Sequence, residues 1–267
     1  MVQRRSARQA DLTGCLAELQ RRGLVPDDWI AVLCVGSVAL GWDNPGSDYD
    51  FVVVSTSEWA GDRAGSVPVQ VRPRSVPIAV TTVDNRRWEI KFWLDTQVDQ
   101  VFAKVSHARF ESGRAPSREL VDAEELFLER LTTCVPLCGA DWVERRQTAL
   151  ARSAFRAFTV TRSLAQADAS VEDALGQLAE GDVISAVLAA RIAFGHAIDA
   201  LLESRGRYGS RSAKWRARRF QEANPPHLSF ERYWAFETMA GLDPAAPERW
   251  VEQVVEVCKN LSLEAEL

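Results

Sequence analysis

The sequence predicts an α+β protein in which a small mixed β-sheet domain with flanking helices spans residues 1–140 and an all-helical domain spans residues 141–267. In the first half, apolar runs of strand length alternate with segments of helical periodicity. In the second half, apolar residues recur only at helical spacing. A chain of 267 residues that is 46% hydrophobic can bury two modest cores, so we expect two folded domains.

The elements of the first half are bounded by turn residues. The first helix is expected to end at Gly23, and the Asp84-Asn85 turn predicts a hairpin. In order, we expect a helix over 6–22, a strand over 30–35, a short helix after Ser37, a strand over 48–54, a loop over 55–75, strands over 76–83 and around 87–93, helices over 97–110 and 122–133, and a turn at 137–139.

The second half is expected to contain helices alone. A long helix is predicted over 142–166, and Ser170 with Asp173 is typical of the start of another. The Asn224-Pro225-Pro226 segment breaks the chain, and a last helix is expected over 247–263. One helix before Gly206 has a continuous stripe made of Ile184, Val187, Leu188, Arg191, Gly195, Ile198 and Leu202.

Two carboxylates, Asp48 and Asp50, open an apolar run shortly after an earlier run ends in Gly36-Ser37. Residues two apart on a strand share a face, and two carboxylates held together favour a cation between them. Mg²⁺ prefers oxygen ligands and leaves positions for phosphates. Gly36 allows the backbone to approach a ligand closely, and Ser37 offers a hydroxyl and an N–H near a helix start. The pattern predicts a metal and triphosphate site.

A third carboxylate, Glu89, lies in a segment that alternates like a strand. Trp88, Ile90 and Phe92 share one face, and Glu89, Lys91 and Trp93 share the other. A carboxylate within so apolar a strand is costly unless it is paired or binds a metal, so Glu89 is our third candidate ligand. The alternative is an edge strand with a solvated Glu-Lys face.

Together these motifs resemble the nucleotidyltransferase superfamily that includes DNA polymerase β and the antibiotic nucleotidyltransferases. The family signature is Gly-Ser, a spacer, Asp-x-Asp within a strand, and a later carboxylate. Gly36-Ser37, Asp48-Tyr49-Asp50 and Glu89 match it in turn, and the matching segment covers about residues 30–95. The order of a catalytic domain and a helical domain resembles the kanamycin-type and lincosamide-type enzymes.

The resemblance implies a catalytic site with two Mg²⁺ ions, held by Asp48, Asp50 and Glu89, and a nucleoside triphosphate such as ATP as co-substrate. Gly36 and Ser37 would bind the departing phosphates. An acceptor hydroxyl would attack the α-phosphate and release pyrophosphate. A general base from the helical half is expected by the same resemblance, with Glu129, Asp182 and Asp199 as candidates.

A Gly-rich basic segment of the helical half, 205–216, resembles a segment associated with such transferases. Lys214 is our candidate for a triphosphate contact, because a charged amine suits phosphate. Arg191 and Tyr208 are expected to bind the acceptor substrate, facing Lys91 and Trp93. The alternative is a solvated basic loop with Trp215 as a core anchor.

Charge and cysteine content restrict partners and location. The net charge of −5 argues against a nucleic-acid partner, because such binders usually carry a basic surface. The start of the chain lacks an apolar signal segment and no uncharged run is long enough for a bilayer, so we expect a cytoplasmic protein without a membrane partner. Five scattered cysteines fit reduced thiols rather than a zinc site.

Three functions remain open after these arguments. The first is transfer of a nucleoside monophosphate to a hydroxyl of a small molecule, an antibiotic or a metabolite, in resistance or biosynthesis. The second is modification of a protein, as in toxin–antitoxin or regulatory enzymes. The third is a catalytically silent relative that binds nucleotide. The helical half can wall a substrate pocket, which favours the first.

Overall fold

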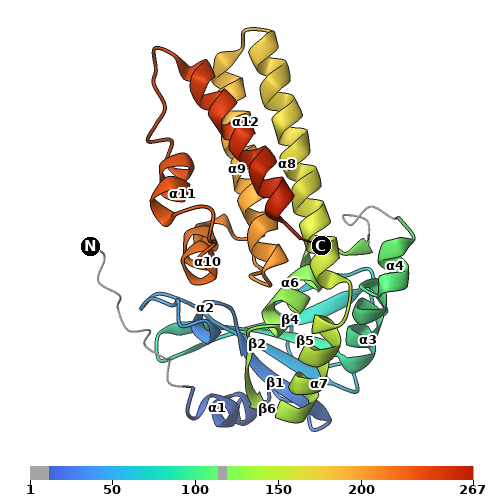
Figure 1. Ribbon diagram of the computed structural model, residues 1–267. Coiled ribbons are helices and arrows are strands. Elements are labelled where there is room, and N and C mark those ends of the chain that lie inside the picture. The colour runs from blue at the N-terminus through green and yellow to red at the C-terminus, as the bar shows by residue number, and fades with distance from the viewer. Residues whose placement is uncertain (1–11, 114–118, 267) are drawn as a thin grey trace. The chain divides into compact units, whose positions relative to one another are not determined.

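The predicted α+β class is confirmed by the computed structural model, which describes residues 12–113 and 119–266 (Figure 1). A mixed sheet with helices occupies the N-terminal part, and a helical region follows it. The predicted helix over 6–22 is described only from residue 12, and its earlier part lies outside the described residues.

Within the described residues, six strands form one sheet in the order β3-β4-β5-β2-β1-β6. Strand β2 runs parallel to β5, and the other neighbouring pairs are antiparallel. The strands are β1 (Trp29–Val35), β2 (Tyr49–Ser55), β3 (Gly65–Pro68), β4 (Ser75–Val83), β5 (Arg86–Leu94) and β6 (Val135–Cys138). The central position of β1 and β2 explains why their apolar runs are continuous, since both faces are covered.

Two short strands were not expected from the sequence. Strand β3 lies in the segment predicted as a loop and pairs with β4, although Gly and Pro weaken its strand pattern. Strand β6 replaces the predicted turn at 137–139 and pairs with β1. The predicted Asp84-Asn85 turn is present, and both residues adopt positive φ, as the favoured hairpin turns require.

The helices described before residue 154 are α1 (Cys15–Arg21), α2 (Gly36–Ala39), α3 (Asp95–Lys104), α4 (His107–Glu111), α6 (Asp122–Leu131) and α7 (Ala140–Ala151). Helix α1 contributes Cys15 and Leu19 to the apolar cluster on one face of the sheet. Helix α6 packs on the other face, where Phe127 lies against Trp93 with ring centroids 4.6 Å apart. Both faces of β5 are therefore covered.

The remaining helices are α8 (Phe155–Ala179), α9 (Val183–Ser204), the 3₁₀ turn η1 (Ala213–Trp215), α10 (Arg216–Ala223), α11 (Phe230–Glu237) and α12 (Pro247–Glu264). Helix α9 packs along α8 and α12. Asp182 caps α9 by accepting a hydrogen bond from the Ser185 N–H at 3.1 Å, and Pro247 begins α12.

The long helix predicted over 142–166 is wrong, because α7 ends before α8 begins. Ser153 binds the Leu150 carbonyl with both its N–H, at 3.1 Å, and its hydroxyl, at 2.8 Å. A serine that bonds locally in this way competes with helix continuation. The predicted helix start at Ser170 is also wrong, because α8 runs through this residue.

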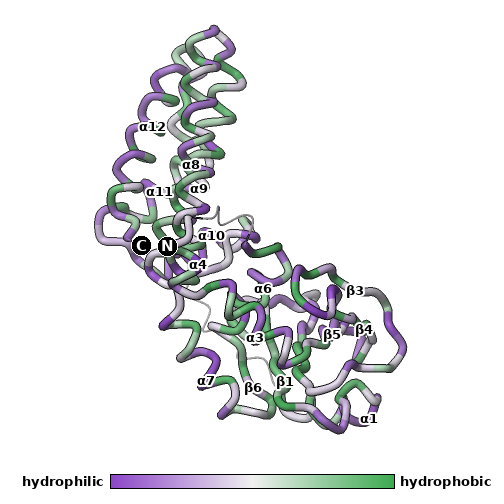
Figure 2. The backbone as a smooth tube through the Cα atoms, turned by 90° about the vertical axis from the view of Figure 1, so that its right-hand side faces the viewer, coloured by the Kyte–Doolittle hydropathy of each residue, from purple (hydrophilic) through white to green (hydrophobic). Residues whose placement is uncertain are grey.

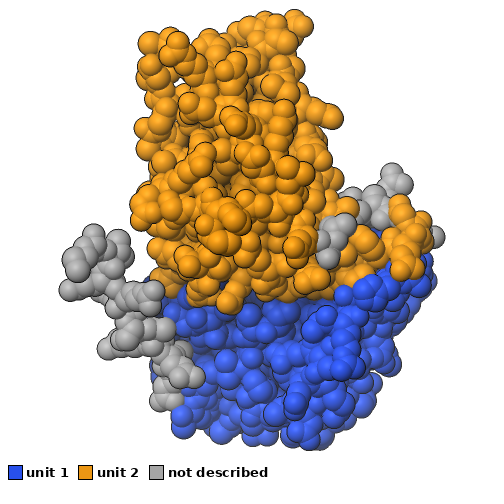
Figure 3. All heavy atoms as spheres, viewed as in Figure 1, with its two compact units in different colours: residues 1–109, 119–153 blue, residues 110–118, 154–267 orange. Residues whose placement is uncertain are grey.

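The chain divides into two compact units, coloured separately in Figure 3. The sheet unit comprises residues 1–109 and 119–153, and the helical unit comprises residues 110–118 and 154–267. The domain boundary expected at residue 140 stays a prediction, because compactness alone is not a test of independent folding.

Helix α9 is the one helix of the described residues that is long and apolar enough to span a membrane by length and composition. Its tube is mostly apolar in Figure 2. About half of this segment, 56%, is buried inside the helical unit, and core helices pass the same test, so this is weak evidence for a membrane span.

Candidate functional site

Three adjacent strands bring Gly36, Asp50 and Glu89 together in the sheet unit. Asp50 on β2 lies opposite Glu89 on the parallel strand β5. On its other side, Asp50 lies opposite Val35, the last residue of β1, and Gly36 follows directly. Strand register therefore places the glycine turn and two of the predicted carboxylates in one neighbourhood.

Glycine is required at position 36 both by the backbone conformation and by the lack of room for a Cβ. Its φ of +73° lies in the left-handed region that favours glycine, and a Cβ added there would lie 2.7 Å from the Asp50 Oδ2. Ser37, the second residue of the short helix α2, is half-buried. The turn between β1 and α2 thus holds the backbone directly against the Asp50 carboxylate.

Basic side chains engage the other two carboxylates. Arg87 Nη1 lies 2.8 Å from Asp48 Oδ2, and Arg87 Nη2 lies 2.9 Å from Glu89 Oε2. The Lys91 ammonium binds the second oxygen of Glu89 at 2.6 Å. One guanidinium therefore bridges Asp48 and Glu89. Burial raises the pKa of Glu89, but the hydrogen bonds and charges of Lys91 and Arg87 outweigh it, so this pKa is lowered.

Asp50 is half-buried, with 22% of its side chain exposed. Burial raises its pKa, and the negative charges of Glu89 and Asp48 raise it further against the opposing effect of Arg130 and Lys91. Arg130 on α6 approaches Asp50 Oδ2 only to 3.6 Å. A half-buried carboxylate with a raised pKa and a distant partner is stabilised by an additional cation.

The donor set fits Mg²⁺ in chemistry, because it consists of carboxylates on neighbouring backbone positions. The arrangement does not yet form a metal site: no group of three or more His, Cys, Asp or Glu side chains is placed to hold a metal among the residues described. The bridge made by Arg87 accounts for this, because its guanidinium occupies the space between Asp48 and Glu89. Metal binding would require Arg87 to move, and its side chain is 46% exposed.

The chain is similar to several solved structures. One of them is a nucleotidyltransferase-like protein from Exiguobacterium sibiricum, 11% identical, with a TM-score of 0.49 over 94% of this chain and 73% of that chain. No protein-family model and no curated protein matches the chain. Similarity at this level carries no argument about activity, so function is argued below from the residues themselves.

Trp93 does not line a substrate site, contrary to our expectation. It is 1% exposed and packs against Phe127 of α6. The alternation of β5 was correctly predicted, but no local pattern indicates that α6 covers Trp93 on the face that it shares with Glu89. Lys91 lies on that face too, and it binds Glu89 directly.

The helical unit contains the three remaining predicted residues. One of them packs against another ring, and two line a pocket. Tyr208 packs its ring against Phe155, with centroids 4.9 Å apart, which indicates a packing role. Arg191 and Lys214 line a common pocket of about 560 Å³. Arg191 belongs to the stripe identified on α9, and 47% of its side chain is exposed.

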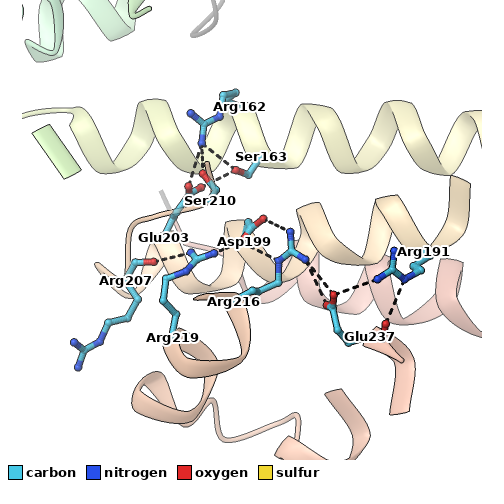
Figure 4. A network of polar contacts seen from close by, with 10 residues as sticks. All are labelled: Arg162, Ser163, Arg191, Asp199, Glu203, Arg207, Ser210, Arg216, Arg219 and Glu237. Carbon is cyan, nitrogen blue, oxygen red and sulfur yellow. Dashed lines mark hydrogen bonds and ion pairs between the residues drawn. The ribbon is translucent and has the colours of Figure 1, made fainter. Parts of the chain in front are cut away.

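Two of the three candidate bases have structural roles. Asp182 caps α9, and Asp199 accepts hydrogen bonds from Arg216 and Arg219 (Figure 4). Glu129 is buried on α6, within the sheet unit and not in the helical half.

Arg87 and Arg130 were missed by the sequence analysis. Arg87 precedes Glu89 by two residues on the same strand, so the alternation that placed Glu89 and Lys91 together also indicated Arg87. Arg130 comes from a helix far along the chain, and no local pattern marks it.

Proposed function

We propose that this chain is a nucleotidyltransferase that moves a nucleoside monophosphate from a nucleoside triphosphate to a hydroxyl of a small molecule, with release of pyrophosphate. The observation that carries this proposal is the contact between the Gly36 turn and the Asp50 carboxylate, with Glu89 in register beside it. A glycine backbone beside a half-buried carboxylate leaves room for a phosphate chain that a cation bridges to the carboxylate.

Asp48, Asp50 and Glu89 would hold Mg²⁺ in this proposal. Bound Mg²⁺ supplies positive charge to neutralise the phosphate oxygens. The half-buried Asp50 favours a cation because its partner Arg130 is 3.6 Å away. Arg87 would leave its bridge between the other two carboxylates, and its charge would then be available to a phosphate.

The chemistry is an in-line displacement at phosphorus. The acceptor oxygen forms a bond to the α-phosphorus, the bond from that phosphorus to the bridging oxygen breaks, and pyrophosphate leaves with the electron pair. The hydroxyl proton passes to a base. Gly36 and Ser37 would contact the departing phosphates through the turn between β1 and α2. Arg87 and Lys91 line the same face of β5 and would stabilise the developing negative charge.

A second function, nucleotide binding without catalysis, is favoured by one observation. Each carboxylate of the triad already has a basic side chain near it, namely Arg87, Lys91 or Arg130. A triad that is neutralised by the protein itself needs no metal. In that case a triphosphate would bind but would not react.

A pyrophosphate-release screen distinguishes the two. The full chain is incubated with each of the common nucleoside triphosphates and Mg²⁺, with and without panels of hydroxyl-bearing small molecules. We expect pyrophosphate release that depends on both the acceptor and Mg²⁺. Calorimetric binding of a triphosphate without release for any acceptor would assign the chain to the silent class.

A further inference from the structure

The helical unit contains a pocket that the proposed chemistry does not use. Its volume of about 560 Å³ falls in the range of small-molecule sites. Four elements contribute to the walls: α9 with Leu188 and Arg191, the η1 turn with Lys214, α10 with Ala217, and α11 with Trp234 and Glu237. All of them belong to the same compact unit.

The pocket wall carries two cations that the protein neutralises incompletely. Lys214 is exposed and, among the residues that the structure describes, forms no salt bridge; its Nζ lies 5.2 Å from the ring centroid of Trp215. Arg191 reaches Glu237 only loosely, with Nη2 at 3.7 Å from Oε1 and Nε at 3.3 Å from the backbone carbonyl.

The negative charge of Glu237, the one acidic residue among the described residues of the pocket wall, is partly neutralised by Arg216. Arg216 Nη1 lies 3.4 Å from each of its carboxylate oxygens (Figure 4). Asp199 holds that guanidinium in place with a bond of 2.8 Å, and only 11% of the Arg216 side chain is exposed. Since Glu237 is shared between Arg216 and Arg191, the pocket face retains a positive excess.

Apolar surface lies beside these charges. Trp234 is 47% exposed and Leu188 is 55% exposed, which is unusual for side chains of this size. Tyr233 is buried beneath them, and burial raises its pKa, so its ring stays neutral. An open aromatic face next to two cations suits a flat ring that carries an anionic group.

We propose that this pocket binds a planar ligand with a carboxylate, sulfonate or phosphate group, with the ring against Trp234 and Leu188 and the anion between Arg191 and Lys214. Its identification as the acceptor substrate rests on the proposed function, whereas binding itself does not. The positive excess disfavours a polycationic ligand. Two sources share this chemistry: an anionic aromatic acceptor and the nucleoside triphosphate.

Fluorescence titration of the full chain with anilinonaphthalene sulfonate tests the proposal. This probe is a flat anion whose emission rises in apolar surroundings. The matched neutral probe is phenylnaphthylamine, which has the same ring system without the sulfonate. Lys214→Gln and Arg191→Gln remove one cation each. Lys259→Gln and Arg249→Gln remove exposed cations of α12, outside the pocket, as matched controls.

We expect the sulfonate to bind the wild type and to lose about tenfold in affinity in each pocket variant, the loss expected for one hydrogen bond to a charged group. The controls should keep wild-type affinity, and the neutral probe should not distinguish any variant. No binding up to about 1 mM overturns the proposal. Equal affinity in all variants, or a loss in only one pocket variant, overturns it too.

Competition separates the two sources of ligand. Displacement of the bound sulfonate by ATP in the absence of Mg²⁺ assigns the pocket to the triphosphate, and retention of the probe assigns it to the acceptor. Melting curves of each variant confirm that the fold is intact. Failure of pyrophosphate release would overturn the proposed function but leave this binding result unchanged, so the two failures are distinguishable.

Discussion

Gly36 and Asp50 show how a single missing side chain shapes the candidate site. The positive φ of Gly36 turns the chain from β1 into α2, and the absence of a Cβ lets the Asp50 carboxylate lie against the backbone. Any larger residue would push the carboxylate from its place.

Gly36→Ala is expected to lower both stability and activity. The left-handed backbone alone costs about 1–3 kcal/mol for a residue with a Cβ. Gly23→Ala is the matched control, because Gly23 has a φ of +69° and nothing within 4 Å of an added Cβ. Chemical denaturation should show a larger loss for Gly36→Ala than for Gly23→Ala, and the difference reports the contact with Asp50. Equal losses of stability would mean that the Asp50 carboxylate moves away from the added Cβ without a measurable cost.

Arg87→Gln is expected to strengthen Mg²⁺ binding, because it removes the cation that bridges Asp48 and Glu89. The hydrogen bonds to these acids raise the pKa of Arg87, so the guanidinium remains charged and competes with a metal. Calorimetric titration with Mg²⁺ alone measures the effect, with Arg74→Gln, an exposed arginine, as control. Mg²⁺ affinity equal to the wild type would show that Arg87 does not occupy the metal position.

Among the elements, α8 and α9 are joined by a buried polar contact. Glu203 on α9 accepts hydrogen bonds from the Ser163 hydroxyl at 2.7 Å and from Arg162 Nη2 at 3.1 Å. Burial raises the pKa of Glu203 to about 7, although Arg162 opposes the shift. The folded state therefore holds a proton on Glu203 more tightly than the unfolded chain does.

This raised pKa predicts a pH-dependent stability. The stabilisation from the bound proton is complete below the unfolded pKa and is lost as the pH rises through about 7. Glu203→Gln cannot titrate, so its melting temperature relative to the wild type should increase between about pH 5 and about pH 8. The change is on the order of 1 kcal/mol per pH unit. A difference that is constant or falls with pH would contradict the titration of Glu203.

The elements also show what periodicity can predict. Long apolar runs identified β1 and β2, because a strand buried on both faces needs them, and alternation identified β5. The short strands β3 and β6 escaped prediction, since their pairing with neighbours defines them more than their own residues do. The break between α7 and α8 depends on the bonds of Ser153, which helical periodicity does not reveal.

Prediction of the candidate site has the same limit, because local patterns identify residues but not their contacts with distant segments. Asp50 and Glu89 were predicted from residue type and spacing, and strand register places them side by side. Their basic partners depend on tertiary packing, and Arg130 comes from α6, far along the chain. The burial of Trp93 under α6 likewise depends on a distant segment.

On the scale of the whole molecule, the two units contain different polar features. The sheet unit contains the carboxylates and the Gly36 turn, and the helical unit contains the cationic pocket.

Acceptor-dependent pyrophosphate release by Asp50→Asn tests whether the carboxylates of the sheet unit catalyse transfer. The carboxamide keeps the size of the half-buried side chain but not its charge, so the fold should persist while transfer falls by at least about tenfold, the equivalent of 1.4 kcal/mol in the barrier. Asp62→Asn, which changes an exposed carboxylate of the same unit, is the matched control and should keep wild-type rates. Loss of release in Asp50→Asn alone is the predicted result. Release by Asp50→Asn at the wild-type rate, with melting curves unchanged, would contradict catalysis at this site.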